Sequence, residues 1–177
     1  MNIVFLDRDG TVIQEPFDER VDTVDKIELF SDSIEALQYL ADNDFGIVFI
    51  TNQAGIAEGR IDEEEFWKIH SEVLNLLSVS GVSFVKTYMN SETGTDASEW
   101  KKPGPNMLLQ AAKDLNLDLS KLYMVGDSQS DIQASINAGC KGGVLINTTQ
   151  NKPVESYGAI YSASSLLDAI RYVVAHS

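Results

Sequence analysis

Cysteine is almost absent from this sequence: its 177 residues contain only Cys140, so no intrachain disulfide can form. A disulfide-stabilised secreted scaffold is therefore excluded, and a reducing compartment is expected. Hydrophobic runs are also short, and none approaches the ~20 residues that a helix needs to span a bilayer. A charged motif begins at residue 7, which leaves little room for a secretory signal. These absences predict a cytoplasmic protein that does not enter a membrane.

Basic residues are scarce as well. The sequence has 13 Lys and Arg against 27 Asp and Glu, and its net charge is −14. Such a surface repels a nucleic-acid backbone, whose binding depends on Lys and Arg releasing counterions, so no nucleic-acid partner is expected. A small anionic substrate needs locally concentrated positive charge, and the basic residues near the motifs below are Arg8, Arg60, Lys101 and Lys102. A bound cation is expected to supply much of the remaining attraction.

Histidine occurs only twice. His70 falls within a helical pattern and His176 lies near the end of the sequence, and both are interpreted as surface or packing residues. Neither a Ser-His-Asp nor a Cys-His catalytic arrangement is evident.

What the sequence does contain is an alternation of apolar runs and helical patterns. Its 44% hydrophobic and 23% charged residues are typical of a globular protein, and its length fits a single domain, 1–177. The apolar runs predict strands at 3–6, 46–50, 83–89, 121–125, 144–146 and 159–161. Apolar residues at helical spacing predict helices at about 32–43, 62–79, 105–115, 128–139 and from 164 onward, with a Gly-bearing loop at 54–60. This alternation favours an α/β fold, a Rossmann-like three-layer sandwich with a mainly parallel central sheet and no separate cap domain.

Polar clusters lie at or shortly after the ends of these predicted strands. Asp7-Arg8-Asp9-Gly10-Thr11 follows the first strand, and Thr51-Asn52-Gln53 follows the second. Lys102-Pro103 comes after the third strand, and Gly126-Asp127, with Asp131 four residues on, follows the fourth. Parallel sheets bind ligands beyond the carboxyl ends of their strands, so we expect the clusters to share one crevice. Taken singly, each cluster has a plainer interpretation as a turn, a solvated lysine pair or a helix cap.

Taken together and in this chain order, the clusters resemble the motifs of the haloacid dehalogenase (HAD) superfamily of aspartate-nucleophile phosphohydrolases. The resemblance covers residues 3 to about 147. Within the superfamily, the runs at 5–11, 51–57, 101–109 and 126–134 are most similar to the D-glycero-D-manno-heptose 1,7-bisphosphate phosphatase and histidinol-phosphate phosphatase group. This resemblance implies a HAD-like fold and Mg²⁺-dependent hydrolysis of a small phosphorylated metabolite, such as a sugar phosphate or bisphosphate.

The resemblance also implies roles for individual residues. Asp7 would be the nucleophile that forms an aspartyl-phosphate, and Asp9 the general acid and base. Mg²⁺ would be held by the Asp7 side chain, the Asp9 backbone carbonyl and Asp127, because hard oxygen ligands suit this ion. Thr51 and Lys102 would contact the phosphoryl oxygens. The residues assigned to substrate binding are Asn52, Arg60, Lys101 and, near the opening of the site, Arg8. Asp131, Thr11 and Ser128 are expected to contact and orient the catalytic residues. Asp131 is also a candidate ligand of the metal ion.

The chain departs from that group at three places. Residues 90–100 contain no Cys or His where the group commonly carries a zinc loop, so no zinc is expected there. Lys101 stands where the group typically has Arg, and Glu58 stands where the heptose enzymes tend to have a basic residue. Phosphatase chemistry tolerates all three departures, but recognition of a second phosphate is left open.

Four other functions stay open at this point. Histidinol-phosphate phosphatase belongs to the same group, whereas the net charge of −14 argues against a polynucleotide 3′-phosphatase. The presence of both Asp7 and Asp9 argues against a catalytically silent HAD-fold binding protein. A phosphomutase usually needs a lid to exclude water, and no insertion is long enough to form one. The sequence specifies neither the substrate, nor the oligomeric state, nor what covers the site in place of a cap.

Overall fold

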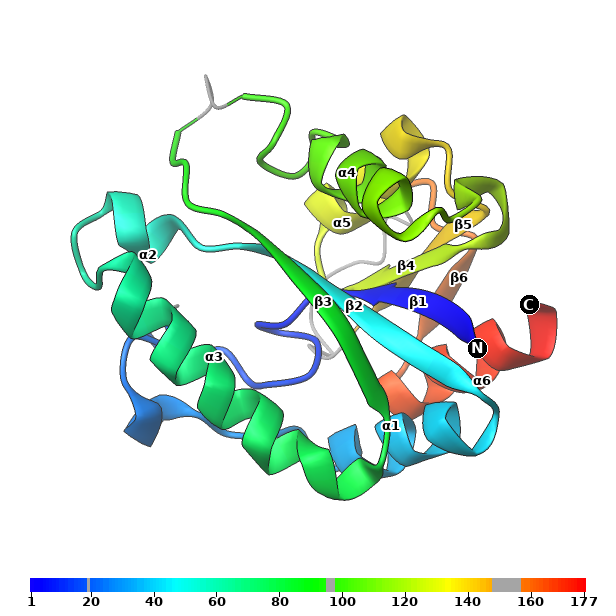
Figure 1. Cartoon of the computed structure of the whole chain (residues 1–177), viewed down its shortest axis with the longest axis horizontal. Coiled ribbons are helices and arrows are strands. Elements are labelled where there is room, and N and C mark those ends of the chain that lie inside the picture. The colour runs from blue at the N-terminus through cyan, green and yellow to red at the C-terminus, as the bar shows by residue number, and fades with distance from the viewer. Residues whose placement is uncertain (19, 95–97, 148–156) are drawn as a thin grey trace.

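Six parallel strands form one sheet within residues 1–18, 20–94, 98–147 and 157–177, the parts of the chain that the computed structural model describes (Figure 1). Across the sheet the strands are β3 (Ser83–Asn90), β2 (Phe45–Asn52), β1 (Asn2–Leu6), β4 (Tyr123–Gly126), β5 (Gly142–Ile146) and β6 (Tyr161–Ala163). Phe5 of β1 is paired with Val48 on one side and Met124 on the other. The strand order therefore reverses between β1 and β4, which is where open α/β sheets bind their ligands.

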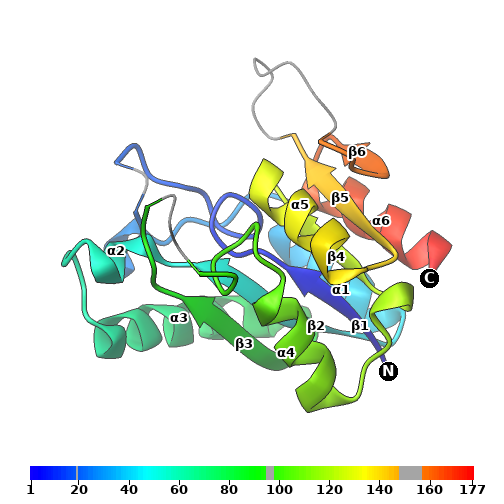
Figure 2. The same cartoon turned by 90° about the horizontal axis from the view of Figure 1, so that it is seen from above.

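Helices cover both faces of this sheet (Figure 2). One face carries α1 (Ser33–Asp42), α3 (Glu63–Leu77) and α6 (Leu166–His176), and the other carries α4 (Asn106–Leu115) and α5 (Gln129–Ala138). The remaining short helices are α2 (Ala54–Ala57), η1 (Val24–Lys26), η2 (Ser78–Ser80) and η3 (Leu119–Lys121). The predicted three-layer α/β sandwich with a parallel sheet is confirmed.

The central strand β1 shows why its apolar run has no polar interruption. Val4 and Leu6 point into the core beneath α1, α3 and α6, while Ile3 and Phe5 point into the core beneath α4 and α5. Alternate side chains of a strand face opposite sides of a sheet, so a strand covered on both faces needs apolar residues throughout. The run ends at Leu6 because the next residue, Asp7, lies at the carboxyl edge of the sheet.

Local signals set the ends of several helices. The Asp62 side chain accepts a hydrogen bond from the Glu65 backbone N–H at 2.8 Å, and three acidic residues occupy the first turn of α3. Both features stabilise a helix N-terminus, where N–H groups are unpaired and the helix dipole is positive. A C-terminal signal acts at α5, whose C-cap residue is Gly139. The φ of this glycine, 77°, lies in the left-handed region that ends a helix.

Several predicted bounds were wrong. β2 ends two residues later than predicted, at Asn52, and β5 begins two residues earlier, at Gly142. The predicted loop at 54–60 contains the short helix α2, and only Gln53 separates this helix from the end of β2. The fourth strand starts at Tyr123 and not at Lys121, because the Asp118 side chain accepts from the Ser120 N–H at 3.1 Å and stabilises η3 in that place. The last strand lies two residues later than predicted, at 161–163. The predicted loop at 90–100 is described only in part, since 95–97 lie outside the described residues.

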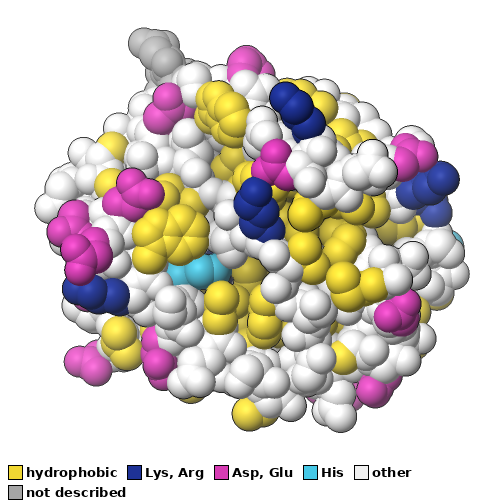
Figure 3. All heavy atoms as spheres, in the orientation of Figure 1, with side chains coloured by type: hydrophobic (Ala, Val, Ile, Leu, Met, Phe, Trp, Pro, Cys, Tyr) yellow, Lys and Arg dark blue, Asp and Glu magenta, His cyan; other side chains and the backbone are white. Residues whose placement is uncertain are grey.

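The segment between β1 and α1 folds without a second sheet in its described residues. It contains η1 and isolated bridges that join Ile13 to Asp9 and to Leu29. On the face that β3 crosses, hydrophobic side chains gather toward the middle, with Asp and Glu mostly around them (Figure 3). Among the described helices, none is both long and apolar enough to cross a membrane.

Candidate active site

The loop that follows β1 is a tight turn built on one carbonyl. The Arg8 carbonyl oxygen accepts hydrogen bonds from the backbone N–H groups of Thr11, Val12 and Ile13 at 3.3, 2.9 and 3.1 Å, and the Gly10 N–H donates to the Ile13 carbonyl at 2.8 Å. This turn holds the carboxylates of the loop at the carboxyl edge of the sheet. The Asp7 N–H donates to the Val125 carbonyl at 2.9 Å, which ties the loop to β4.

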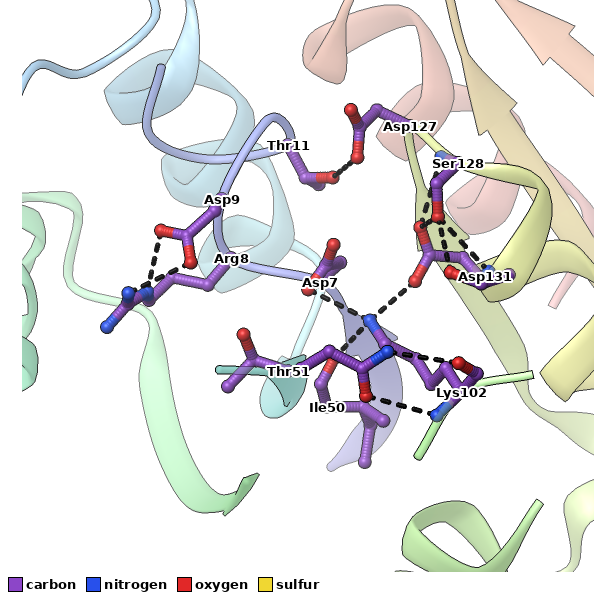
Figure 4. A network of polar contacts seen from close by, with 12 residues as sticks. Asp7, Arg8, Asp9, Thr11, Ile50, Thr51, Lys102, Asp127, Ser128 and Asp131 are labelled. Atoms are coloured by element: carbon purple, nitrogen blue, oxygen red, sulfur yellow. Dashed lines mark hydrogen bonds and ion pairs between the residues drawn. The ribbon is translucent and has the colours of Figure 1, made fainter. Parts of the chain in front are cut away.

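A buried lysine lies between two of the predicted carboxylates (Figure 4). Lys102 Nζ is 2.9 Å from Asp7 Oδ1 and 2.5 Å from Asp131 Oδ1, and it donates to the Ile50 carbonyl at 2.7 Å. Lys102 is 3% exposed and Asp131 is fully buried. Three elements far apart in sequence thus meet at one ammonium group.

Asn52 fixes the backbone of this lysine. Its Nδ2 donates to the Lys102 carbonyl at 3.0 Å, and its Oδ1 accepts from the Lys102 N–H at 3.0 Å. Both hydrogen-bonding ends of the amide are therefore used on the lysine, although Asn52 also lines the pocket described below.

Asp127 faces the N-terminal loop from the end of β4. Its Oδ1 lies 3.5 Å from the Thr11 hydroxyl, which donates to it. A Cβ atom at Gly10 would lie 2.3 Å from Asp127 Oδ2, and φ at Gly10 is +78°, so this position requires glycine. A Cβ atom at Gly126 would likewise lie 2.3 Å from Asp131. The two glycines allow both aspartates to approach the backbone closely.

Asp131 has donors on both of its oxygens. Oδ1 faces Lys102, whereas Oδ2 accepts from the Ser128 backbone N–H at 3.1 Å and from its hydroxyl at 2.6 Å. The Ser128 hydroxyl oxygen in turn accepts from the Asp131 N–H at 3.4 Å, forming a capping box at the start of α5. Asp131 therefore orients Lys102 and the first turn of α5 at once.

Asp9 is held by two neighbours. Arg8 Nε donates to Asp9 Oδ1 at 3.0 Å, and Arg8 Nη2 donates to Asp9 Oδ2 at 2.9 Å. Gln53 Nε2 donates to Asp9 Oδ2 at 2.5 Å and to the Thr51 hydroxyl oxygen at 2.8 Å. Figure 4 shows the Asp9 carboxylate turned toward Arg8. The guanidinium carbon of Arg8 lies 5.0 Å from the ring centroid of Phe66 in α3. This cation–π contact helps to hold the Arg8 side chain that binds Asp9.

These carboxylates line a pocket of about 760 Å³. Asp7, Asp9, Asp127 and Lys102 lie in its wall, and the other polar side chains of the wall are contributed by Gln14, Glu15, Arg20, Asp22, Asn52, Gln53, Ser128, Gln129, Ser130 and Asn147. The volume suits a small metabolite, since ligand pockets of this kind span roughly 300–1,000 Å³.

Among the described residues that line this pocket, carboxylates outnumber basic side chains. Burial raises the pKa of Asp7 well above its ordinary value; the Lys102 ammonium opposes the shift, while Asp131, Asp127 and Asp9 add to it. Burial, then Asp131 and Glu15, raise the pKa of Asp127 to about 7. Burial alone lowers the pKa of Lys102, but Asp131 and Asp7 raise it, and the net pKa lies above the ordinary value. A bound cation would relieve this excess of negative charge.

Several known proteins resemble this chain in sequence and in fold. Residues 99–170 match the model of the HAD-hydrolase-like family. The D-glycero-β-D-manno-heptose-1,7-bisphosphate 7-phosphatase of Yersinia pestis is 35% identical over 163 residues, which cover 88% of this chain and 84% of the relative. The chain belongs to the HAD family of phosphatases.

Further members resemble the chain in part or in full. The bifunctional histidine biosynthesis protein HisB of Spirosoma linguale is 31% identical over 176 residues, 97% of this chain, but the chain spans only 44% of that relative. The crystal structure of the D,D-heptose 1,7-bisphosphate phosphatase of B. bronchiseptica, complexed with magnesium and phosphate, superposes with a TM-score of 0.89 at 28% identity. The two chains cover each other completely.

The acidic residues of this HAD family member fit a divalent cation. Carboxylate oxygens of Asp7, Asp127 and Asp131 lie within 4.8 Å of one another. Asp7 Oδ1 is buried and accepts no well-directed hydrogen bond from the described residues, even though Lys102 Nζ is near. Hard oxygen ligands suit Mg²⁺. Because both oxygens of Asp131 already have donors, Asp7 and Asp127 are the side chains best placed to bind the ion directly.

Four side chains lie elsewhere than expected. Arg8 is fully buried and is not near the opening, because a buried guanidinium needs a counter-charge and Asp9 provides it. Arg60 lies outside the pocket lining and within 4 Å of Glu58 and other acidic side chains. The Lys101 ammonium donates to the Gly94 carbonyl at 3.0 Å, also outside the lining. Thr51 is fully buried, and its hydroxyl oxygen accepts from Gln53 Nε2, so it does not line the pocket as expected.

Several pocket residues were not anticipated, among them Gln53 and Arg20. Gln53 belongs to the predicted Thr51-Asn52-Gln53 cluster, so its place beside two assigned residues was a usable signal. Arg20 lies in an acidic, irregular segment and carried no such signal. It lines the pocket and its guanidinium pairs with Glu58 at 3.1 and 2.8 Å.

Proposed function

We propose that the protein is a Mg²⁺-dependent phosphomonoester hydrolase that acts through an aspartyl-phosphate on a small phosphorylated metabolite. The observation that carries this proposal is the meeting of three carboxylates, Asp7, Asp127 and Asp131, within 4.8 Å of one another. Two of them, Asp7 and Asp131, contact the buried ammonium of Lys102. Three carboxylates and one ammonium suit a site that binds a cation and a phosphoryl group together. Asp7 and Asp127 would hold the ion, with the Asp9 carbonyl as a further oxygen ligand.

The proposed reaction has two displacements at phosphorus. An Asp7 carboxylate oxygen forms a bond to phosphorus as the bond to the leaving oxygen breaks, and Asp9 gives its proton to that oxygen. Asp9 then takes a proton from a water molecule, whose oxygen attacks phosphorus and releases Asp7 and inorganic phosphate. Lys102 holds Asp7 in place and offsets the charge of the phosphoryl oxygens. Bound Mg²⁺ supplies the positive charge that lets a carboxylate approach a phosphate dianion.

A sugar phosphate or bisphosphate of the heptose 1,7-bisphosphate kind is the substrate we propose first. The relatives that match this chain over most of their own length carry that activity in their names. The pocket wall carries many polar side chains, as a sugar requires, and the Arg20 guanidinium in this wall would pair with a second phosphate.

Histidinol phosphate is the second candidate, and a specific feature favours it. Glu15 and Asp22 line the same pocket, where they would attract an amino group and repel a second phosphate. The matching HisB proteins are consistent with this candidate, although the chain spans 44% of their length.

One screen separates these candidates. Sugar monophosphates, heptose 1,7-bisphosphate and histidinol phosphate are each incubated with the protein, with and without Mg²⁺, and released phosphate is measured. A preference for the bisphosphate supports the first candidate, and a preference for histidinol phosphate supports the second. Asp7→Asn should abolish turnover. If the wild type releases no phosphate from any substrate, or if Asp7→Asn remains active, the proposed chemistry is wrong.

Three broader expectations go with this proposal. We propose that residues 1–177 form one domain, because the two apolar clusters lie on opposite faces of the same sheet. We also retain a cytoplasmic location and the absence of a nucleic-acid partner as predictions from composition.

A further inference from the structure

Gln53 connects Asp9 to the carboxyl ends of β2 and β3. Its side-chain nitrogen donates to Asp9 Oδ2 at 2.5 Å and to the Thr51 hydroxyl oxygen at 2.8 Å. Its backbone N–H donates to the Asn90 carbonyl at 2.7 Å. Gln53 is 8% exposed and lines the pocket. The amide is thus anchored to two strands and reaches Asp9 from that fixed base.

The two oxygens of Asp9 differ in how many donors they meet. Among the described residues, Oδ2 accepts from both Gln53 and Arg8 Nη2, whereas Oδ1 accepts from Arg8 Nε alone. A carboxylate oxygen has about two lone-pair sites, so Oδ2 is saturated and Oδ1 keeps one site. Asp9 lines the pocket and its side chain is 18% exposed. Oδ1 is therefore the oxygen with capacity for a substrate.

Resting on the phosphatase function proposed above, we propose that Gln53 is a positioning residue for the proton transfers at Asp9. With Arg8, it fixes the carboxylate so that Oδ1 carries the transferred proton. Oδ1 gives this proton to the leaving oxygen as the phosphorus–oxygen bond breaks. Oδ1 then takes a proton from the water molecule whose oxygen bonds to phosphorus. Without Gln53 the Oδ2 site is open, and the proton can sit on the wrong oxygen.

This role predicts a dependence on the leaving group. A nitrophenolate leaves readily without protonation, whereas an alkoxide needs a proton, and a general acid contributes about 10²–10⁴-fold to such a step. We therefore expect Gln53→Met to lower kcat about 10–100-fold for an alkyl phosphate and less than about 3-fold for p-nitrophenyl phosphate. KM should change little for either substrate, because both Nε2 hydrogens of Gln53 are already donated within the protein, to Asp9 and Thr51.

The experiment measures kcat and KM of the full chain with Mg²⁺ on both substrates. Gln110→Met is the matched control, since Gln110 also donates to a carboxylate, Asp114 Oδ1 at 2.6 Å, but lies outside the pocket lining. Gln53→Asn, whose shorter amide cannot reach both partners, is the second variant in case Gln53→Met does not fold. Thermal melting checks each variant.

A double-mutant cycle with Asp9→Asn completes the test. In the Asp9→Asn background, Gln53→Met should no longer discriminate between the two substrates. A selective loss on the alkyl phosphate that disappears in this background supports the proposal. An equal loss on both substrates, no loss in a folded variant, or a selective loss that persists without Asp9 overturns it. If the wild type hydrolyses neither substrate, the phosphatase function itself fails, and the proposal fails with it.

Discussion

Lys102 Nζ lies 2.5 Å from Asp131 Oδ1, and neither side chain is more than 3% exposed. The same carboxylate receives two donors from Ser128 at the start of α5. Asp131 therefore holds the lysine that contacts Asp7 and connects it to the turn that carries Asp127. The geometry of the acidic site depends on this buried ion pair.

Removing Asp131 should destabilise the fold. Asp131→Ala leaves the Lys102 ammonium with one carboxylate fewer in a buried place, and breaking a buried pair costs about 3–5 kcal/mol. Urea unfolding followed by circular dichroism measures the change in the free energy of unfolding. Glu64→Ala is the control, because Glu64 pairs with Lys68 at the surface and should matter little. Equal stability of the two variants would contradict this account of the pair.

Gly10→Ala should weaken the metal site. The new Cβ would lie 2.3 Å from Asp127 Oδ2, so this candidate ligand must move away. We expect the Mg²⁺ concentration for half-maximal activity to rise about 10–100-fold, as it does when supporting contacts of a metal site are lost. Gly81→Ala is matched in backbone, with φ +72°, but its Cβ meets nothing within 4 Å. An unchanged Mg²⁺ requirement in Gly10→Ala would argue against Asp127 as a ligand.

Much of the fold was predictable because its central strands are buried on both faces. β1 and β2 carry uninterrupted apolar runs, which are typical of a strand buried on both faces. Gly139 correctly indicated the end of α5. The failed boundary at the start of β4 depends on a single side chain. Asp118 stabilises a 3-10 turn where Lys121 had been assigned to a strand, and apolarity alone does not reveal this.

Arg20 should affect the recognition of a second phosphate. Arg20→Met removes the pocket guanidinium, and a charge-assisted hydrogen bond is worth about 1.5–3 kcal/mol, so KM for a sugar bisphosphate should rise about 10–100-fold. KM for p-nitrophenyl phosphate should not change. Arg60→Met is the control, because Arg60 also pairs with Glu58 but lies outside the pocket lining. Equal effects of both variants on the bisphosphate would remove Arg20 from the substrate site.

His70 should make the protein less stable in mild acid. It is 2% exposed, its Nε2 lies 2.8 Å from the Thr87 hydroxyl oxygen, and burial, with a contribution from Arg8, lowers its pKa from 6.5 to about 4. The unfolded chain therefore binds a proton between these pH values while the folded chain does not. Stability falls as pH falls through this window, by up to about 3 kcal/mol.

The measurement for His70 is a comparison across pH. The free energy of unfolding is determined by urea at pH 7, 5.5 and 4 for the wild type and for His70→Gln. The wild type should lose more stability than the variant, because glutamine keeps a polar contact to Thr87 but does not titrate. Parallel curves would show that His70 does not contribute to the acid sensitivity.

The site was predictable where residue type and strand position coincide. Asp7, Asp127 and Lys102 converge as the clusters at the strand ends predicted. Side-chain direction was not predictable, because a charge pairs with whichever partner the fold places nearest. Arg8 turns inward to Asp9, and Arg60 turns to Glu58.

The central claim is that Asp7 becomes phosphorylated during turnover, and chemical trapping tests it most directly. The enzyme is quenched with borohydride while it hydrolyses a phosphomonoester in the presence of Mg²⁺, since borohydride reduces an aspartyl-phosphate to homoserine. Peptide mass spectrometry should find homoserine at position 7, and only when substrate and Mg²⁺ are both present. Active turnover with aspartate intact at position 7, or with homoserine at another position, would contradict the account.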